Sequence, residues 1–407
     1  MSVDNVLSGV RVLEVAAWTF VPSAGAVLAE WGAEVIKVEP RAGGDPQRGL
    51  VTMGIVDEGG GAVNYMIEIP NRGKKSIGVD LSTPGGRDVV RELAKTCDVF
   101  LTSYLPDRRK KFGIDVDDIR EANPSIVYVR GSGHGPKGPD ANKPGYDGVS
   151  YWARGGIATV LTTEDAEELV RSRPAFGDLL GGMTIAGGIA AALYKKATTG
   201  QGSVVDVSLL GLAAWNLSPD VAVSQIHGGS AIPKFGHADA PNPLVGTYRT
   251  KDGRYVQLMM LQLDKFYAEA MRVIGLPELV DDPRFADPAS RYENRVSLIA
   301  LLDEAFAERT VAEWREILAP LSGAWGIVQT PAEVCEDPAV TANGYVAVTE
   351  TVNGVPFSIP TNPVQFDEHS VVPAGAPEHG QHTEEVLMDA GLDWETIEKL
   401  KESGAIL

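Results

Sequence analysis

The chain has 407 residues, of which 44% are hydrophobic and 22% charged, and its formal net charge is −19. This length predicts a large buried core and two domains, whereas so acidic a composition argues against a broad nucleic-acid-binding surface, which needs a basic face. We find no uninterrupted apolar run of membrane-spanning length and no secretion signal at the start, so we expect a cytoplasmic protein without a membrane partner.

The first forty residues indicate a parallel, doubly wound α/β fold. Residues 10–15 predict a buried strand, residues 22–31 a helix rich in small side chains, and residues 34–38 a second strand. The turn after the first strand is AAWTFVPSAG and not the GxGxxG of dinucleotide-binding proteins. That difference argues against bound NAD.

Three further strands are predicted before the middle of the chain, at residues 76–80, 98–102 and 126–130, with helices ending near Lys95 and spanning residues 116–121. Residues 41–62 have loop composition. The segment GSGHGPKG, residues 131–138, directly follows the third of these strands. Ligands of such sheets gather beyond the carboxyl ends of strands, so this segment fits either a phosphate-binding loop or a flexible turn.

The rest of the chain is organised around residues 174–210. Asp178 precedes an apolar run, residues 179–194, that is closed by two lysines, and residues 204–207 predict a buried strand. Asp178 therefore sits at or near the first turn of a buried helix. One interpretation is a helix cap, for which Asp is a preferred residue. The other is a reactive carboxylate held beside the helix N-terminus, and the two can both hold.

The second half of the chain predicts a smaller α+β region. Residues 227–243 shift to loop composition and mark a candidate boundary. Hairpins are predicted at residues 245–260, around Asp-Gly, and at residues 345–359, around Asn-Gly. Helices are predicted at residues 265–274, 292–308, 311–318, 383–390 and 394–403.

Few residues offer chemistry. The basic clusters Arg72, Lys74, Lys75 and residues 108–111 (RRKK) fit either solvated surface or a phosphate site. The six histidines form no HxxxH pair and the two cysteines lack metal-ligand spacing, so we expect no metal. Neither a GxSxG elbow nor a cysteine nucleophile motif is present. Asp178 remains the best candidate nucleophile.

Several segments, in this order and spacing, resemble class III coenzyme A transferases, the family that contains formyl-CoA transferase, carnitine CoA-transferase and the related α-methylacyl-CoA racemases. They are GVRVLEVAAW, GAEVIKVEP, NRGKKSIGVDL, GYDGVSYWARGG, GDLLGGMTIAGGIAAAL, TGQGSVVDVSL and GQHTEEVL, which together run nearly from end to end. The resemblance implies that coenzyme A (CoA), as a thioester substrate and product, is the cofactor, and that acyl-CoA and a carboxylic acid are the partners.

The resemblance also implies roles for single residues. Asp178 matches the aspartate that attacks the acyl-CoA thioester to give an acyl–aspartyl anhydride and then an aspartyl-CoA thioester. The family's CoA-contacting segments fall on residues of this chain that include members of both basic clusters: Thr19, Phe20, Val21, Arg41, Pro70, Asn71, Arg72, Gly73, Lys74, Lys75, Thr102, Ser103, Tyr104, Lys111, Lys143, Tyr146 and Asp147.

Three departures from the family pattern bear on the reaction. Residues 234–244 (KFGHADAPNPL) lack the glycine-rich loop of the formyl-CoA enzymes, which argues against oxalate or formate. Pro40, followed by Arg41, replaces a CoA-contacting arginine. Tyr146 stands where the racemases carry a histidine, and a phenol is a poor base at neutral pH.

The family fold implies a large CoA-binding domain made of residues 1–210 and 329–407, a smaller inserted α+β domain at 211–328, and an interlocked homodimer. The function that follows is an acyl-CoA:carboxylate CoA-transferase. A 2-methylacyl-CoA racemase or epimerase, a CoA-binding protein without turnover, and more distantly a nucleotide-dependent oxidoreductase stay open as alternatives. The sequence names neither the acyl donor nor the acceptor.

Overall fold

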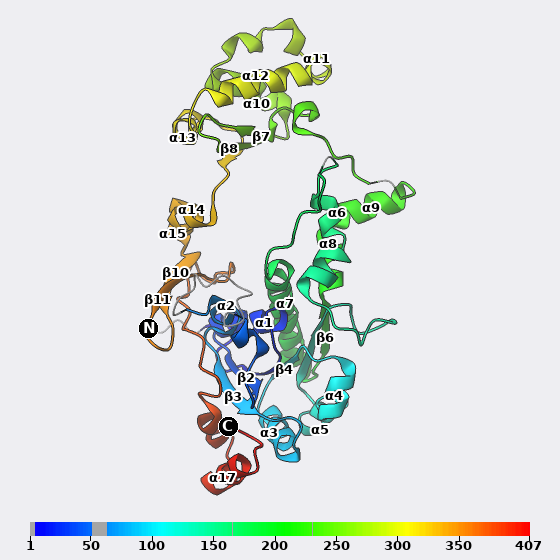
Figure 1. Cartoon of the computed structure of the whole chain (residues 1–407), viewed down its shortest axis with the longest axis vertical. Helices are drawn as coiled ribbons and strands as arrows, with labels where there is room; N and C mark the ends of the chain where they lie inside the picture. The colour runs from blue at the N-terminus through cyan, green and yellow to red at the C-terminus, as the bar shows by residue number, and fades with distance from the viewer. Residues whose placement is uncertain (1–4, 51–62, 165, 230) are drawn as a thin grey trace. The chain divides into compact units, whose positions relative to one another are not determined.

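The computed structural model describes residues 5–50, 63–164, 166–229 and 231–407. These residues form two compact units (Figure 1). The larger unit takes the described residues of 1–162, 166–229 and 339–407, and the smaller takes those of 163–165 and 230–338. Both chain ends thus contribute to the larger unit. The main segment of the smaller unit begins at residue 230 and not at the expected 211, because residues 211–229 contribute helices to the larger unit. It ends at residue 338 and not at the expected 328.

The larger unit contains a six-stranded parallel sheet in the order β3-β2-β1-β4-β5-β6. The expected doubly wound α/β fold is therefore confirmed. The strand order reverses between β1 and β4, and in such sheets a crevice forms beyond the carboxyl ends of these two strands. The strands are β1 (Arg11–Val15), β2 (Glu34–Pro40), β3 (Lys75–Val79), β4 (Val99–Thr102), β5 (Val127–Ser132) and β6 (Val204–Ser208).

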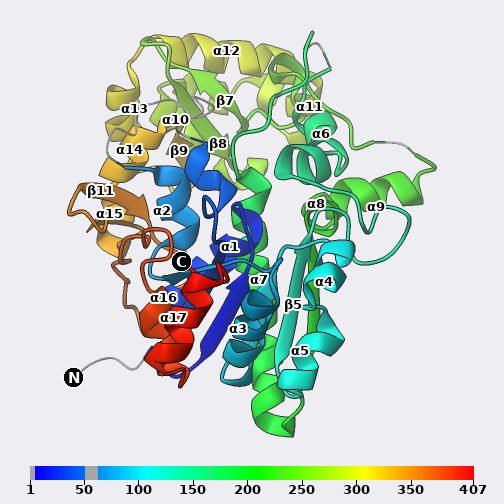
Figure 2. The same cartoon turned by 60° about the horizontal axis from the view of Figure 1, so that its bottom comes forward.

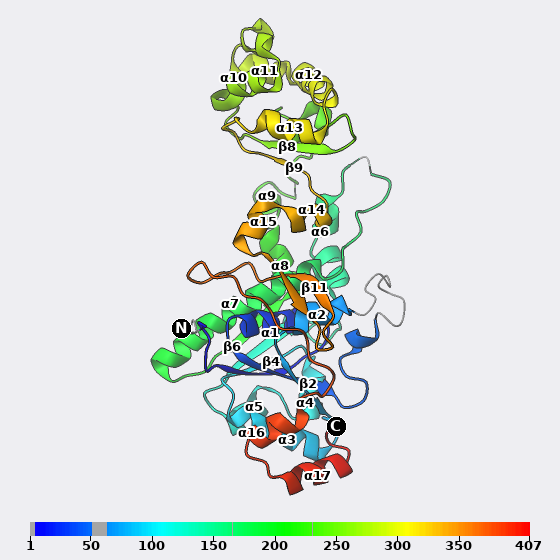
Figure 3. The same ribbon diagram turned by 90° about the vertical axis from the view of Figure 1, so that its left-hand side faces the viewer.

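Helices cover both faces of this sheet, because successive side chains of a buried strand point to opposite faces. Val12 and Val35 pack with the core of α1 (Phe20–Glu30), α7 (Phe176–Thr199) and α8 (Leu209–Asn216). Leu13 and Ile36 pack with the opposite core. Figures 2 and 3 show that the opposite face carries helices from both ends of the chain. These helices are α3 (Pro84–Lys95), α5 (Val116–Ala122), α16 (Thr383–Asp389) and α17 (Trp394–Glu402).

Helix α7 crosses the core beside α1. Gly181 and Gly182 permit this approach, since a Cβ atom at either position would lie 2.3 Å from the Phe20 ring or 2.1 Å from the Ser23 hydroxyl. By length and composition α7 could also span a membrane, but core helices of globular domains pass the same test and one face of α7 is buried here. The expectation that β6 is buried is wrong: β6 is the last strand of the sheet and its side chains are half-buried or exposed.

The smaller unit is an α+β arrangement around one core. Strands β7 (Val245–Arg249) and β8 (Tyr255–Met259) form the predicted antiparallel hairpin, and β9 (Trp325–Ile327) joins β8. Trp314 and Phe306, both fully buried, lie at the centre of this core. The helices are α10 (Leu263–Ile274), α11 (Pro288–Glu293), α12 (Arg295–Ala307), α13 (Val311–Leu318) and α14 (Pro331–Glu336).

The second predicted hairpin is confirmed as β10 (Val346–Glu350) with β11 (Pro356–Pro360). Several short helices were not predicted from the sequence: α2 (Tyr65–Asn71), α4 (Pro106–Phe112), α6 (Ile157–Leu161), α8, α9 (Ser218–Ile226), α11, α14 and α15 (Pro338–Asn343). Of the predicted loop at residues 41–62, residues 51–62 lie outside the described part of the chain.

Candidate functional site

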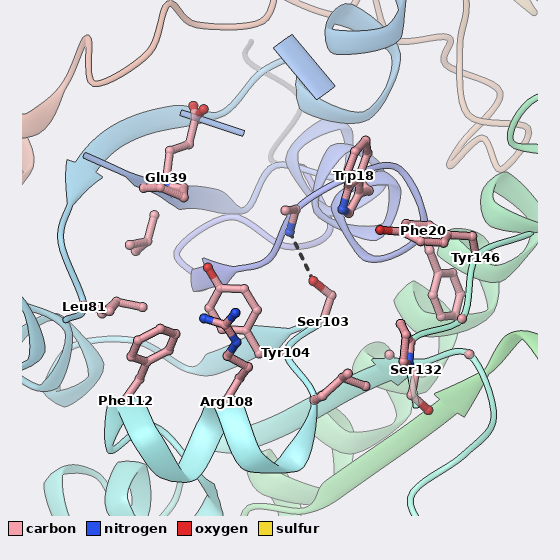
Figure 4. A pocket seen from close by; sticks show the side chains of 18 of the residues that line it. Trp18, Phe20, Glu39, Leu81, Ser103, Tyr104, Arg108, Phe112, Ser132 and Tyr146 are labelled. Carbon is pink, nitrogen blue, oxygen red and sulfur yellow. Dashed lines mark hydrogen bonds between the residues drawn. The ribbon is translucent and has the colours of Figure 1, made fainter. Parts of the chain in front are cut away.

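A cavity of about 640 Å³ lies in the larger unit along the carboxyl edge of the sheet (Figure 4). Its lining comes from segments that leave five of the six strands and from the start of α7 and α8. The lining includes Trp18 after β1, Arg41 after β2, Leu81 after β3, Tyr104 after β4 and Gly133 after β5. The site thus occupies the crevice that the reversal of strand order predicts.

Asp178 lines this cavity from the first turn of α7. The interpretation of Asp178 as the helix cap is wrong. The N-cap residue is Ala175, with φ of 58°, and Asp178 is the third helical residue. Burial, followed by repulsion from Asp147, raises the pKa of Asp178 to about 7. Asp178 is therefore a carboxyl group that exchanges its proton near neutral pH.

Asp147 supplies the capping contact from outside the helix. Its Oδ2 atom accepts a hydrogen bond from the backbone N–H of Gly177 at 2.9 Å, while burial raises the pKa of Asp147. Its Oδ1 atom is buried without a hydrogen-bond partner among the described residues. A Cβ atom at Gly177 would lie 2.5 Å from the Tyr151 ring and 2.8 Å from Asp147 Oδ1. Glycine at this position therefore allows the two carboxyl groups to share the helix start.

Trp18 forms one wall of the cavity in a strained conformation. Its φ of 71° lies in the left-handed region, which non-glycine residues rarely adopt. The Trp18 N–H donates to Asp45 Oδ1 at 3.2 Å, and the Trp18 ring meets the Tyr146 ring edge to face with centroids 5.6 Å apart. Such strain persists when surrounding contacts determine the conformation, and it clusters at functional sites.

A buried cluster of ion pairs holds Asp45, the acceptor of the Trp18 N–H. Lys37 pairs with Asp45 at 2.9 Å and with Glu14 at 3.3 Å, and Lys74 pairs with Glu14 at 2.7 Å. All four side chains are fully buried. The cluster thus pairs two lysines with two carboxylates and holds Asp45 beside the Trp18 N–H.

The part of the cavity away from Trp18 carries basic and aromatic side chains. Arg41 lies after β2, where its Nε donates to the Ile406 carbonyl at 2.9 Å. Arg108 on α4 lies 6.0 Å from the ring centroid of Phe112, and Tyr104 packs against the same ring with centroids 5.8 Å apart. This arrangement can hold a phosphate group beside a flat ring.

The structure brings only part of the sequence-predicted site to this cavity. Asp178, Phe20, Arg41, Ser103, Tyr104 and Tyr146 line it. Lys74 lies instead in the ion cluster, Lys75 pairs with Glu34 and Glu385, and Lys143 pairs with Asp140. The other predicted residues that do not line it are Thr19, Val21, Pro70, Asn71, Arg72, Gly73, Thr102, Lys111 and Asp147.

Some of these residues have clear structural contacts. Thr19 donates to Gln47 Oε1 at 3.0 Å, and Asn71 donates to the Ile67 carbonyl at 3.1 Å. Arg72 pairs with Glu30 and lines a second cavity of about 160 Å³. Among the described residues, no three His, Cys, Asp or Glu side chains come together as metal ligands would.

Sequence reasoning missed several lining residues, among them Trp18, Leu81, Arg108, Phe112 and Leu209. Arg108 belongs to the RRKK cluster, and no local pattern distinguishes it from its neighbours there. The signal for the others was position, since each follows the carboxyl end of a strand or lies on the helix after one.

Comparisons with known proteins match this chain over most of its length. The family model described as CoA-transferase family III matches residues 7–383. The (R)-2-hydroxy-4-methylpentanoate CoA-transferase of Clostridioides difficile is 30% identical over 98% of this chain and 99% of that relative. The cinnamoyl-CoA:phenyllactate CoA-transferase of Clostridium sporogenes is 32% identical over 99% of this chain and 98% of that relative. A crystal structure of a CAIB/BAIF family protein from Brucella suis is similar with a TM-score of 0.80 at 28% identity, covering 95% of this chain and all of that one.

Proposed function

Because this chain belongs to CoA-transferase family III, we propose that it moves CoA from an acyl-CoA to a carboxylic acid through covalent intermediates on Asp178. One observation carries this proposal. The Asp178 carboxylate opens into the cavity at the start of α7, with its pKa raised to about 7. A more basic carboxylate is a better nucleophile, and at neutral pH about half of it is ionised.

The chemistry proceeds in four transfers. An oxygen of Asp178 attacks the thioester carbonyl, the C–S bond breaks, and CoA leaves as a thiolate, which gives an acyl–aspartyl anhydride. The thiolate attacks the Asp178 carbonyl, and the donor acid leaves as its carboxylate. The acceptor carboxylate then attacks the aspartyl-CoA thioester and expels the thiolate. The thiolate finally attacks the acceptor's acyl carbon and regenerates the Asp178 carboxylate.

The cavity suggests how CoA lies. Arg41 and Arg108 suit the phosphates of the nucleotide end, and Tyr104 and Phe112 offer rings beside them. The pantetheine arm then runs along the carboxyl edge of the sheet towards Asp178. This orientation places positive charge where the ligand is most negative, although the chain as a whole carries −19.

We also propose that two copies of the chain assemble, as the family resemblance implies. Exposed apolar side chains support this proposal: Trp215 on α8 is 77% exposed and Ile226 on α9 is 74% exposed. Helix α9 buries none of its residues within the chain. Exposed apolar side chains on two consecutive helices favour an interaction site there. Sedimentation should show a dimer, and a folded monomer that appears on dilution would contradict this assembly.

A panel of acyl-CoAs and carboxylic acids, analysed by mass for new CoA thioesters, tests the function. Wild-type protein should produce them, and Asp178→Ala should not. Asp117→Ala is the matched control, because Asp117 also lies in the first turn of a helix, α5, and does not line the cavity. CoA binding without any new thioester would favour a binding protein, and normal turnover by Asp178→Ala would refute the mechanism.

A further inference from the structure

The two ends of the cavity differ in chemistry. Among the described residues that line it, the cations are Arg41 and Arg108, after β2 and on α4. Trp18, Phe20 and Tyr146 gather together, away from Arg108 (Figure 4). We call the part lined by Trp18, Phe20 and Tyr146 the Trp18 end, and among the described residues it has no lining cation.

Asp178 lies at the Trp18 end of the cavity. Phe20 packs against α7 at Gly181, three residues beyond Asp178, where an added Cβ would lie 2.3 Å from the ring. Tyr146 immediately precedes Asp147, whose carboxylate accepts from the N–H of Gly177. Two aromatic side chains are thus tied to the helix turn that presents the reactive carboxylate.

The backbone of Trp18 is held by distant segments, and its ring contacts that of Tyr146. Its backbone is fixed through Asp45, which also accepts from the Gln47 N–H at 3.0 Å and pairs with buried Lys37. The preceding N–H, that of Ala17, donates to Ser103 Oγ at 3.1 Å. Edge-to-face contact with Tyr146 then orients the ring. Two hydrogen bonds from the backbone of Ala17 and Trp18, one of them to an Asp45 that is itself held by Gln47 and Lys37, therefore maintain a backbone conformation that is unfavourable for tryptophan.

We infer that the acids exchanged at Asp178 are monocarboxylic acids with an apolar substituent, branched or aromatic, and that Trp18 selects them. This inference rests on the transferase function proposed above. An apolar substituent gains contact with the rings of Trp18, Phe20 and Tyr146 and gives up no hydrogen bonds.

A dicarboxylic acid would meet the opposite conditions. Its second carboxylate would lose water against aromatic rings without a cation from the described lining. It would also be the fourth carboxyl group there, after Asp178, Asp147 and the reacting carboxyl group of the acid. The site therefore discriminates by rejecting the second charge as well as by binding the apolar group.

Isotope self-exchange tests this inference without mixing donor and acceptor preferences. Each acyl-CoA is incubated with its own deuterated acid, and the label entering the thioester is followed by mass. The pairs are 3-phenylpropanoyl-CoA, 4-methylpentanoyl-CoA, glutaryl-CoA and succinyl-CoA with their acids. We expect kcat/KM for the two apolar pairs to exceed that for the dicarboxylic pairs by at least about 100-fold.

Trp18→Gly removes the ring and suits the backbone, since glycine adopts a φ near 71° without strain. It should lower the preference for 3-phenylpropanoyl over glutaryl at least about tenfold, and Trp18→Phe should keep most of it. Trp394→Ala is the matched control, because Trp394 is a half-exposed tryptophan on α17 that does not line the cavity. Its preference should equal that of the wild type.

The outcomes separate the two proposals. Absence of new thioesters across the whole acyl-CoA and acid panel would overturn the transferase function and this inference with it, whereas activity in that panel without exchange of either apolar pair would overturn the inference alone. Exchange of the dicarboxylic pairs at equal or higher kcat/KM would overturn the inference and leave the transferase standing. An unchanged preference in folded Trp18→Gly, with folding checked by thermal unfolding, would remove Trp18 from substrate selection.

Discussion

Replacing Asp178 with Asn should make the protein more stable, and the gain should grow with pH. Burial and the nearby Asp147 raise the pKa of Asp178 from its ordinary 3.8 to about 7. The folded state therefore binds more protons at this group than the unfolded chain does between these two values. By linkage, the free energy of unfolding of the wild type falls as the pH rises through this interval, and the loss is complete above pH 7. Asn carries no charge and avoids the cost.

The pKa values set the size of the effect. A displacement of about three pH units, at 1.36 kcal/mol each, gives a gain of at most roughly 4 kcal/mol for Asp178→Asn at pH 8. At pH 5 most of the carboxyl is still protonated in the folded state, so the gain shrinks to roughly 2 kcal/mol. Urea unfolding followed by tryptophan fluorescence at the two pH values measures the difference directly.

Asp117→Asn is the control, because Asp117 also lies in the first turn of a helix, α5. Its charge interacts favourably with the helix N-terminus, so this variant should lose about 0.3–1 kcal/mol rather than gain stability. The reasoning would be refuted if Asp178→Asn lost stability at pH 8, as removal of a helix cap would, or if its effect were the same at both pH values.

Three further predictions follow from the site. The exchange rate, measured as kcat/KM, should rise with pH through about 7 and be roughly tenfold lower at pH 6 than at its plateau, and a flat profile would contradict the raised pKa of Asp178. Arg108→Ala should weaken CoA binding, measured by calorimetry, more at low salt than at high salt and more than Lys111→Ala does, because Arg108 lines the cavity and Lys111 does not. In heavy water, 2-methylacyl-CoA should not gain deuterium at its α-carbon, because Tyr146 is a phenol and a poor base. Rapid incorporation would favour a racemase.

The fold was largely predictable because its signals are local. Five of the six strands of the large sheet are short runs in which most residues are buried. Asp-Gly and Asn-Gly mark the two predicted hairpins. The exposure of β6 was not predictable, because an apolar run looks the same in the centre and at the edge of a sheet. Helix α4 was missed because it begins at Pro106, and the sequence around this proline is equally typical of a turn.

A site residue was predictable where its neighbours in the sequence indicate its role. It was not predictable where contacts with distant segments determine its position or partner. Asp178 stands out from its place before an apolar helix. Lys74 looked like a phosphate ligand because its partner, Glu14, is 60 residues away in the chain. Trp18 gave no sign of its positive φ, because tryptophan does not favour that conformation and long-range contacts impose it.

Trapping the intermediate on Asp178 tests the central claim most directly. Protein incubated with a productive acyl-CoA is treated with hydroxylamine, digested, and searched by mass spectrometry for a hydroxamate. We predict the modification on the peptide that contains Asp178, dependent on acyl-CoA, with neither modification nor exchange in Asp178→Ala. A hydroxamate on a different residue, or undiminished exchange by Asp178→Ala, would contradict a covalent mechanism at this carboxylate.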